Sequence, residues 1–245
     1  MSLVHSNFDF LNKPWWRPDY DDHGFMEVHR ERYLIECVSA ECPSRSSHLA
    51  KKVQNLQDTI NDIFPSIFFP NPNRPMDCFT PLLAQHLHKR VGNGLIENAG
   101  RYRTRYVMAA QENYVYLAHY LIENRIEELF HQCRVKFGKK ELGLDEAIKF
   151  WACFLTHFLY IHPFINGNGR VARLLLSYLL SNFTVVPLSL YTGTRTRELY
   201  LQCLRETRYQ DPFMPNALAT YILENVYMTS YNICALMDLN VPSND

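Results

Sequence analysis

Residues that could carry out chemistry are concentrated in one short segment, 160–173. An apolar helical pattern ends there at His162 and Pro163, and an imidazole with an ordinary pKa of about 6.5 can accept a proton at neutral pH. Two glycines follow within seven residues, and a second apolar helical pattern then begins with two arginines in its first turn. The segment reads Tyr160-Ile161-His162-Pro163-Phe164-Ile165-Asn166-Gly167-Asn168-Gly169-Arg170-Val171-Ala172-Arg173.

The start of the second helical pattern has the features of an anion site. The first N–H groups of a helix lack partners within the helix, and the helix dipole places partial positive charge beside them. Gly167 and Gly169 have no Cβ, so the backbone can approach a phosphate closely there. Arg170 and Arg173 share one helix face, and cations in a first turn are unfavourable unless a polyanion binds. The segment thus offers a base, a phosphate cradle and two cations, as phosphoryl or nucleotidyl transfer requires.

A turn between helices that carries surface arginines and no chemistry is the alternative interpretation. The residues after Arg170 argue against it, because they predict a central helix that is buried on nearly all sides. Polar residues confined to the first turn of such a helix need a reason to be there. The apolar set is Val171, Ala172, Leu174, Leu175, Leu176, Tyr178, Leu179 and Leu180.

The elements that must position this segment are mainly helical. A Pro-Asn run at 69–75 predicts a loop, and residues 101–108, rich in aromatic and β-branched side chains, predict a strand or hairpin that is the only β structure expected. The fold class is therefore mainly α, in one domain with a small β element. Apolar periodicity predicts helices over residues 25–40, 47–63, 79–92, 117–137, 144–161, 170–180, 194–208 and 213–236.

Composition excludes several classes of function. The chain has 245 residues, 47% of them hydrophobic, with 25 Lys and Arg against 25 Asp and Glu, so net charge gives no reason to expect nucleic acid or an anionic membrane as partner. The seven cysteines lie mostly in apolar stretches without a Cys-x-x-Cys pair, which favours buried thiols over disulfides or zinc. With no signal-peptide pattern and no long apolar run, we expect a cytoplasmic protein, and secretion as an effector into a host cytosol remains open.

The segment from His162 to Arg173 resembles the signature of the Fic (Fic/Doc) family, His-Pro-Phe-x-(Asp/Glu)-Gly-Asn-Gly-Arg-x-x-Arg, at every fixed position except one. Residues 87–103 are similar to the helix and the Gly-x-x-Arg start of the family's β-hairpin flap, and residues 197–213 to the helices that close its core. The resemblance covers roughly residues 79–228. It implies a Fic-type helical bundle with a flap over 79–245 and C-terminal helices, and leaves 1–78 as an N-terminal helical extension packed on that core.

The resemblance also implies an activity, the transfer of AMP from ATP to a Ser, Thr or Tyr hydroxyl of a target protein. His162 would be the general base. Gly167, Asn168 and Gly169 would form the anion-binding nest, and Arg170 and Arg173 would hold the β- and γ-phosphates. The flap near residues 105–110 would bind the target as an added strand. Self-modification and a homo-oligomer are left open, and neither nucleic acid nor membrane is an expected partner.

Four residues have less specific signals. Asn166 stands where the family usually has Asp or Glu to bind Mg²⁺, so we expect it to be a weak metal ligand. Tyr200 either lines the adenine pocket or belongs to the core. Thr220 and Glu224 fit the family's inhibitory pattern (Ser/Thr)-x-x-x-Glu-(Gly/Asn), in which the Glu pairs with the second signature Arg; the alternative is that Glu224 is a solvated helix residue.

Three other functions remain open from the sequence. The fold could transfer UMP, phosphate or phosphocholine, since the signature alone does not choose among them. It could also be a Fic scaffold or binding protein with weakened catalysis, of which Asn166 would be the first sign. A metal-dependent hydrolase that uses His86, His88, His157 or His162 is the third, although His86 and His88 would point the same way only in a strand and their region is predicted to be helical.

Overall fold

In the computed structural model the part of the chain that is described comprises residues 48–63, 76–109, 114–137, 142–181, 190, 194–207 and 215–236. Its helices are mostly those that the sequence predicts. They are α3 (Leu49–Ile63), α4 (Pro81–Val91), α5 (Ile122–Phe137), α6 (Leu144–Ile161), α7 (Asn168–Leu180), α8 (Thr194–Glu206) and α9 (Asn216–Leu236), with short 3₁₀ helices η2 (Met76–Cys78) and η3 (His119–Leu121). The helix predicted over 25–40 and the loop over 69–75 lie outside the described residues.

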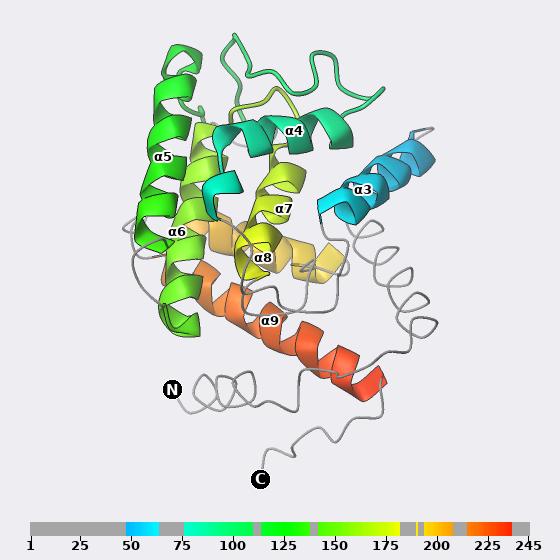
Figure 1. The fold of residues 1–245 in the computed structure, drawn as a ribbon, viewed down its shortest axis with the longest axis vertical. Helices are drawn as coiled ribbons and strands as arrows, with labels where there is room; N and C mark the ends of the chain where they lie inside the picture. Colours follow the sequence, from blue (N-terminus) through cyan, green and yellow to red (C-terminus); the bar gives the residue numbers. More distant parts are fainter. Residues whose placement is uncertain are drawn as a thin grey trace.

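Helices α6 and α7 form the centre of the bundle (Figure 1). Helix α5 lies beside α6, α4 crosses the end of the bundle that holds the α6–α7 loop, and α9 crosses the opposite end (Figure 1). Helix α3 packs against α4. The predicted N-terminal extension over residues 1–78 and its boundary stay predictions.

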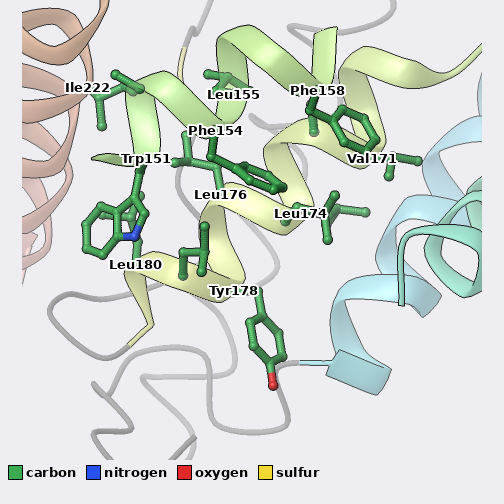
Figure 2. Close-up of a cluster of buried hydrophobic side chains, with 14 of the residues drawn as sticks. Trp151, Phe154, Leu155, Phe158, Val171, Leu174, Leu176, Tyr178, Leu180 and Ile222 are labelled. Atoms are coloured by element: carbon green, nitrogen blue, oxygen red, sulfur yellow. The ribbon is translucent and has the colours of Figure 1, made fainter. Parts of the chain in front are cut away.

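Large apolar side chains of α6 and α7 fill the interior (Figure 2). Trp151 and Phe158 of α6 are fully buried, and so is Leu176 of α7. Phe79, from the turn before α4, packs its ring 4.8 Å from Phe130 and 5.2 Å from Phe154, between centroids. Because burying one such side chain contributes about 1.5–3 kcal/mol, this core holds α6 and α7 against each other. The predicted all-round burial of α7 is confirmed.

Two boundaries differ from the prediction. Helix α5 begins at Ile122 and not at Leu117, because the Leu117 N–H donates to Tyr160 O (3.3 Å), which holds this stretch extended along the end of α6. Helix α7 begins two residues earlier than predicted, at Asn168, so that both signature glycines lie at its start.

The predicted hairpin is present only as a single antiparallel bridge between Met108 and Val115, within the residues that the structure describes. Ala109 N–H donates to Tyr114 O (3.0 Å) and Tyr116 N–H to Val107 O (3.3 Å), so the two sides run antiparallel. Residues 110–113 lie outside the described ranges.

No helix in the described ranges has the length and apolarity needed to cross a membrane.

Candidate active site

His162 follows the last residue of α6 and has a left-handed backbone, φ 49°. Glycine is the usual residue at such a helix end, since a side chain costs about 1–2 kcal/mol in this conformation. The following Pro163 cannot continue the helix, which explains why α6 ends here. The left-handed turn directs the chain away from the helix axis, into the loop that leads to α7.

The imidazole of His162 is held from two sides. Its Nδ1 lies 3.3 Å from Leu159 O, and its ring stacks on Tyr116 at 3.8 Å between centroids with 15° between the planes. A carbonyl only accepts, so Nδ1 carries the proton and Nε2 keeps its lone pair. Desolvation lowers the pKa of His162 from 6.5 to about 4, partly opposed by the Leu159 bond and assisted by the charge of Arg103. The ring is therefore neutral at pH 7, as a general base must be.

The loop after His162 is fixed by the side chain of Asn168. Its Oδ1 accepts the Phe164 N–H (2.9 Å) and its Nδ2 donates to Phe164 O (2.8 Å), both buried. The amide of Asn168 thus faces the protein, and only its backbone N–H is available to the predicted anion nest. Gly167 precedes α7 with φ 79°, and no side chain of the described residues caps this helix start. The first N–H groups of α7 thus have the arrangement of an anion site.

Arg170 and Arg173 lie at this helix start, both half-buried. An Arg173 terminal nitrogen lies 3.3 Å from where a Cβ on Gly169 would be, and one of Arg170 lies 3.5 Å from the same position on Gly167. The only side-chain bond described for Arg170 is a long one to Val91 O, at 3.4 Å. The structure therefore brings both guanidinium groups next to the glycine backbone, where a bound phosphate chain would lie.

His88 of α4 holds the loop by contacts with Asn166 and Phe164, a role that the sequence did not reveal. Its Nδ1 accepts the Gly100 N–H (2.8 Å), so its Nε2 carries the proton and donates to Asn166 O (3.0 Å). The ring stacks on Phe164 at 3.9 Å between centroids, with 9° between the planes. Burial, the largest effect, lowers the pKa of His88 to about 4, which keeps this neutral arrangement at pH 7. The sequence marked His88 only as a helical residue and as a doubtful metal ligand.

Comparison with known proteins now decides the family. The Fic/DOC family model matches residues 78–180, which hold the base, the loop and both arginines. Residues 78–180 belong to the Fic/DOC family.

Curated relatives match over short stretches. The chain is 36% identical over 87 residues to a protein of Aquifex aeolicus (strain VF5) called "Probable protein adenylyltransferase aq_aa38", a match that covers 36% of this chain and 24% of that protein. It is 32% identical over 68 residues to the ribonucleoside-diphosphate reductase small chain of Ostreid herpesvirus 1 (isolate France), covering 26% of this chain and 12% of that protein. Both matches thus span less than a quarter of the relative's length.

Solved structures share the fold over more of the chain. Fic-1 (aa134–508) from C. elegans superposes with a TM-score of 0.70 at 18% identity, covering 97% of this chain and 71% of that one. BepC from Bartonella tribocorum, solved with bound AMPPNP, has a TM-score of 0.51 at 15% identity and covers 73% of this chain and 84% of its own. At these identities the likeness shows a Fic fold and no more.

Asn166 departs from the Fic signature, and its geometry fits a weak metal ligand. The side chain is exposed, and its Oδ1 accepts the Gly167 N–H at 2.7 Å. An amide oxygen has a second lone pair, so one position toward a cation remains. No cluster of three or more His, Cys, Asp or Glu side chains that could hold a metal occurs among the described residues. The donors present would fit a magnesium ion held mainly by nucleotide phosphates.

Tyr200, Thr220 and Glu224 are not brought to the loop by any contact that the structure describes. Tyr200 is 3% exposed, and its ring lies 6.0 Å from that of Tyr221 in the core, so an adenine contact stays a prediction. Thr220 and Glu224 are exposed on α9. The pKa of Cys203 on α8 is raised mainly by burial, and the negative charge of Glu224 adds a smaller increase. Helix α9 lies at the opposite end of the bundle from the loop (Figure 1). The inhibitory pair of Glu224 with Arg173 therefore stays a prediction.

The prediction of buried thiols can be compared for four cysteines, since Cys37, Cys42 and the side chain of Cys234 lie outside the described part of the chain. Cys133 and Cys203 are buried and free, whereas Cys78 is exposed and Cys153 is half-buried. Cys78 lies in the short turn η2 before α4, where the chain is at the surface.

Proposed function

We propose that this protein is an adenylyltransferase that moves AMP from ATP to a Ser, Thr or Tyr hydroxyl of a target protein. The observation that carries the proposal is the position of His162. A neutral imidazole with a lone pair on Nε2 lies at the end of α6, one short loop away from a helix start that no described side chain caps. The same helix start bears Arg170 and Arg173. The name of the Aquifex relative and the AMPPNP in the BepC structure support a nucleotide as the ligand.

The anion site would orient ATP by its phosphates. The N–H groups of residues 168–170 and the dipole of α7 attract negative charge, and the two guanidinium groups match the β- and γ-phosphate oxygens. The glycines leave the space beside the two guanidinium groups open, since a Cβ on Gly167 would lie 3.5 Å from an Arg170 nitrogen and one on Gly169 3.3 Å from an Arg173 nitrogen. These groups would hold ATP whether or not His162 is present.

The transfer step then needs a base at the target hydroxyl. The hydroxyl oxygen forms a bond to the α-phosphorus, its proton passes to Nε2 of His162, and the bond from the α-phosphorus to the bridging oxygen breaks. The electron pair leaves with pyrophosphate, which Arg170 and Arg173 stabilise as its charge builds. With a pKa of about 4, the protonated ring then loses its proton readily to solvent.

The target would bind along the hairpin segment, that is, the described residues on either side of the Met108–Val115 bridge. Its backbone is paired at Met108 and Val115, whose side chains are 56% and 52% exposed, and Tyr116 links the segment to His162 through the ring stack. An extended target strand added to this segment would place a hydroxyl near the base. A magnesium ion bound to the nucleotide, with Asn166 Oδ1 as an optional ligand, would neutralise charge on the leaving pyrophosphate.

The test is transfer of label from ATP. Wild-type protein is incubated with a lysate or alone, with ATP labelled at the α-phosphate and, separately, at the γ-phosphate. Label from the α-position alone supports AMP transfer, whereas γ-label indicates phosphate transfer. His162→Ala should lower transfer by about 10²–10⁴-fold while ATP binding changes little. His157→Ala, one turn earlier on α6, is the matched control and should stay active.

Undiminished labelling by His162→Ala would refute His162 as the base. Mass spectrometry after incubation with UTP, GTP and CTP identifies another nucleotide if ATP is not the donor. No labelling with any nucleotide, by wild type or in a lysate, would favour the scaffold alternative.

A further inference from the structure

The Arg103 side chain binds backbone carbonyl groups at the end of α6 and on both sides of the Met108–Val115 bridge. Its Nε donates to His162 O (2.8 Å) and a terminal nitrogen donates to Ile161 O (3.2 Å), at the end of α6. Its Nη1 donates to Arg105 O (2.7 Å), and Nη2, the nitrogen that also binds Ile161 O, donates to Leu117 O; these two carbonyls lie on opposite sides of the Met108–Val115 bridge. The Arg103 N–H also donates to Pro163 O (2.9 Å). One side chain, 5% exposed, therefore joins the turn at His162 to the hairpin.

This arrangement has a clear physical purpose at a helix end. The last carbonyls of a helix have no partners within it, and a cation is favoured beside them by the helix dipole. Arg103 supplies both, and carbonyl oxygens are its partners among the described residues. Burial of its charge is unfavourable and lowers the pKa of the guanidinium, so the side chain is held there by these bonds.

The bond to His162 O bears directly on the catalytic ring. His162 has a left-handed backbone that a non-glycine residue adopts at a cost of about 1–2 kcal/mol. Fixing its carbonyl fixes the peptide plane after it, and the side-chain direction follows from the backbone. The bonds to Arg105 O and Leu117 O fix the hairpin to the same guanidinium, and with it Tyr116, on which the His162 ring stacks.

We propose that Arg103 is a positioning residue for the transfer reaction: it holds His162 in its left-handed conformation and sets the hairpin at a fixed distance from the base. This inference rests on the proposed function in so far as His162 is the base. The described bonds of the Arg103 side chain all go to backbone carbonyls. Arg103 acts by keeping the proton acceptor and the docked hydroxyl in one rigid frame, which governs kcat far more than ATP affinity.

Two variants separate geometry from charge. Arg103→Lys keeps the charge but can reach only some of the carbonyls, and Arg103→Ala removes every bond. Arg101→Ala is the matched control, since Arg101 is exposed and lines the same cavity of about 530 Å³ beside the hairpin. We expect both Arg103 variants to lower kcat at least tenfold, with the KM for ATP changed less than about threefold, because other groups hold the phosphates. Arg101→Ala should match the wild type.

Rescue by free guanidinium tests the position itself. Because Arg103 lines the cavity, guanidinium ion can enter the space that Arg103→Ala leaves and bind the exposed carbonyls. We expect guanidinium to raise the kcat of Arg103→Ala severalfold and to leave the wild type and Arg101→Ala unchanged. Wild-type kcat in both Arg103 variants would overturn the inference.

A spectroscopic measurement is independent of activity. With histidine labelled at Cε1, the His162 ring resonance is assigned by its loss in His162→Asn, and stacking on Tyr116 should give it a ring-current shift. We expect this shift to be lost in Arg103→Ala and Arg103→Lys, in folded protein, and kept in Arg101→Ala. An unchanged resonance in the Arg103 variants would overturn the positioning role even if kcat falls. If the resonance moves but no nucleotide is transferred by the wild type, Arg103 still positions His162 and it is the proposed function that fails.

Discussion

Gly167 is the residue at which a single methyl group should separate the stability of the fold from the binding of phosphate. Its φ of 79° is unfavourable for alanine by about 1–2 kcal/mol. Alanine also restricts the unfolded chain, which returns about 0.4–1 kcal/mol. The added Cβ would lie 3.2 Å from Ile96 Cδ1, the end of a flexible side chain that can shift, so this contact adds little. We expect Gly167→Ala to lower the free energy of unfolding by about 1 kcal/mol, and Tm by about 2–4 °C.

Gly169→Ala is the matched control, because Gly169 is helical. Alanine there should raise the free energy of unfolding by about 0.5 kcal/mol, while its Cβ, 3.3 Å from an Arg173 nitrogen, crowds the guanidinium. Thermal unfolding followed by circular dichroism, with and without ATP, checks both effects. ATP at about ten times its Kd should stabilise the wild type by about 1.4 kcal/mol, and both variants should lose part of this stabilisation. The reasoning would be refuted if Gly167→Ala were as stable as the wild type. It would also be refuted if Gly169→Ala lowered the free energy of unfolding as much as Gly167→Ala does.

Two further predictions concern charge at the site. Asn166→Asp should lower the Mg²⁺ concentration needed for half-maximal transfer, since a carboxylate binds magnesium better than an amide, and a metal titration with α-labelled ATP that finds equal requirements would remove Asn166 from the metal site. The pKa of His162, about 4 in the fold against 6.5 unfolded, means that the unfolded chain binds more protons between these pH values, so stability is complete above pH 6.5 and falls as the pH drops toward 4. At pH 5 this loss of stability is about 2 kcal/mol. Urea unfolding at pH 7.5 and pH 5 measures it: between these pH values the free energy of unfolding should fall less in His162→Asn than in the wild type, by about that amount. An equal fall in both proteins would contradict the burial of a neutral ring.

The sequence by itself determined most of the described helices and marked the residues of the predicted anion site. Apolar periodicity predicted α6 with both of its ends, and the burial of α7, because a helix buried on nearly all sides leaves a pattern that few other structures produce. The glycines and arginines of the loop were equally visible, since positive φ, a free helix start and adjacent cations each depend on local residues.

Only the tertiary structure decided what holds these parts in place. Arg103 lies 59 residues from His162 and binds its carbonyl, and His88 lies 78 residues from Asn166 and binds that carbonyl. Bonds to backbone carbonyls leave no trace in residue type at the accepting end, so no spacing rule reveals them. The same reason explains the late start of α5: Leu117 is extended because of the partner it finds on α6, and local propensity contains no information about that partner.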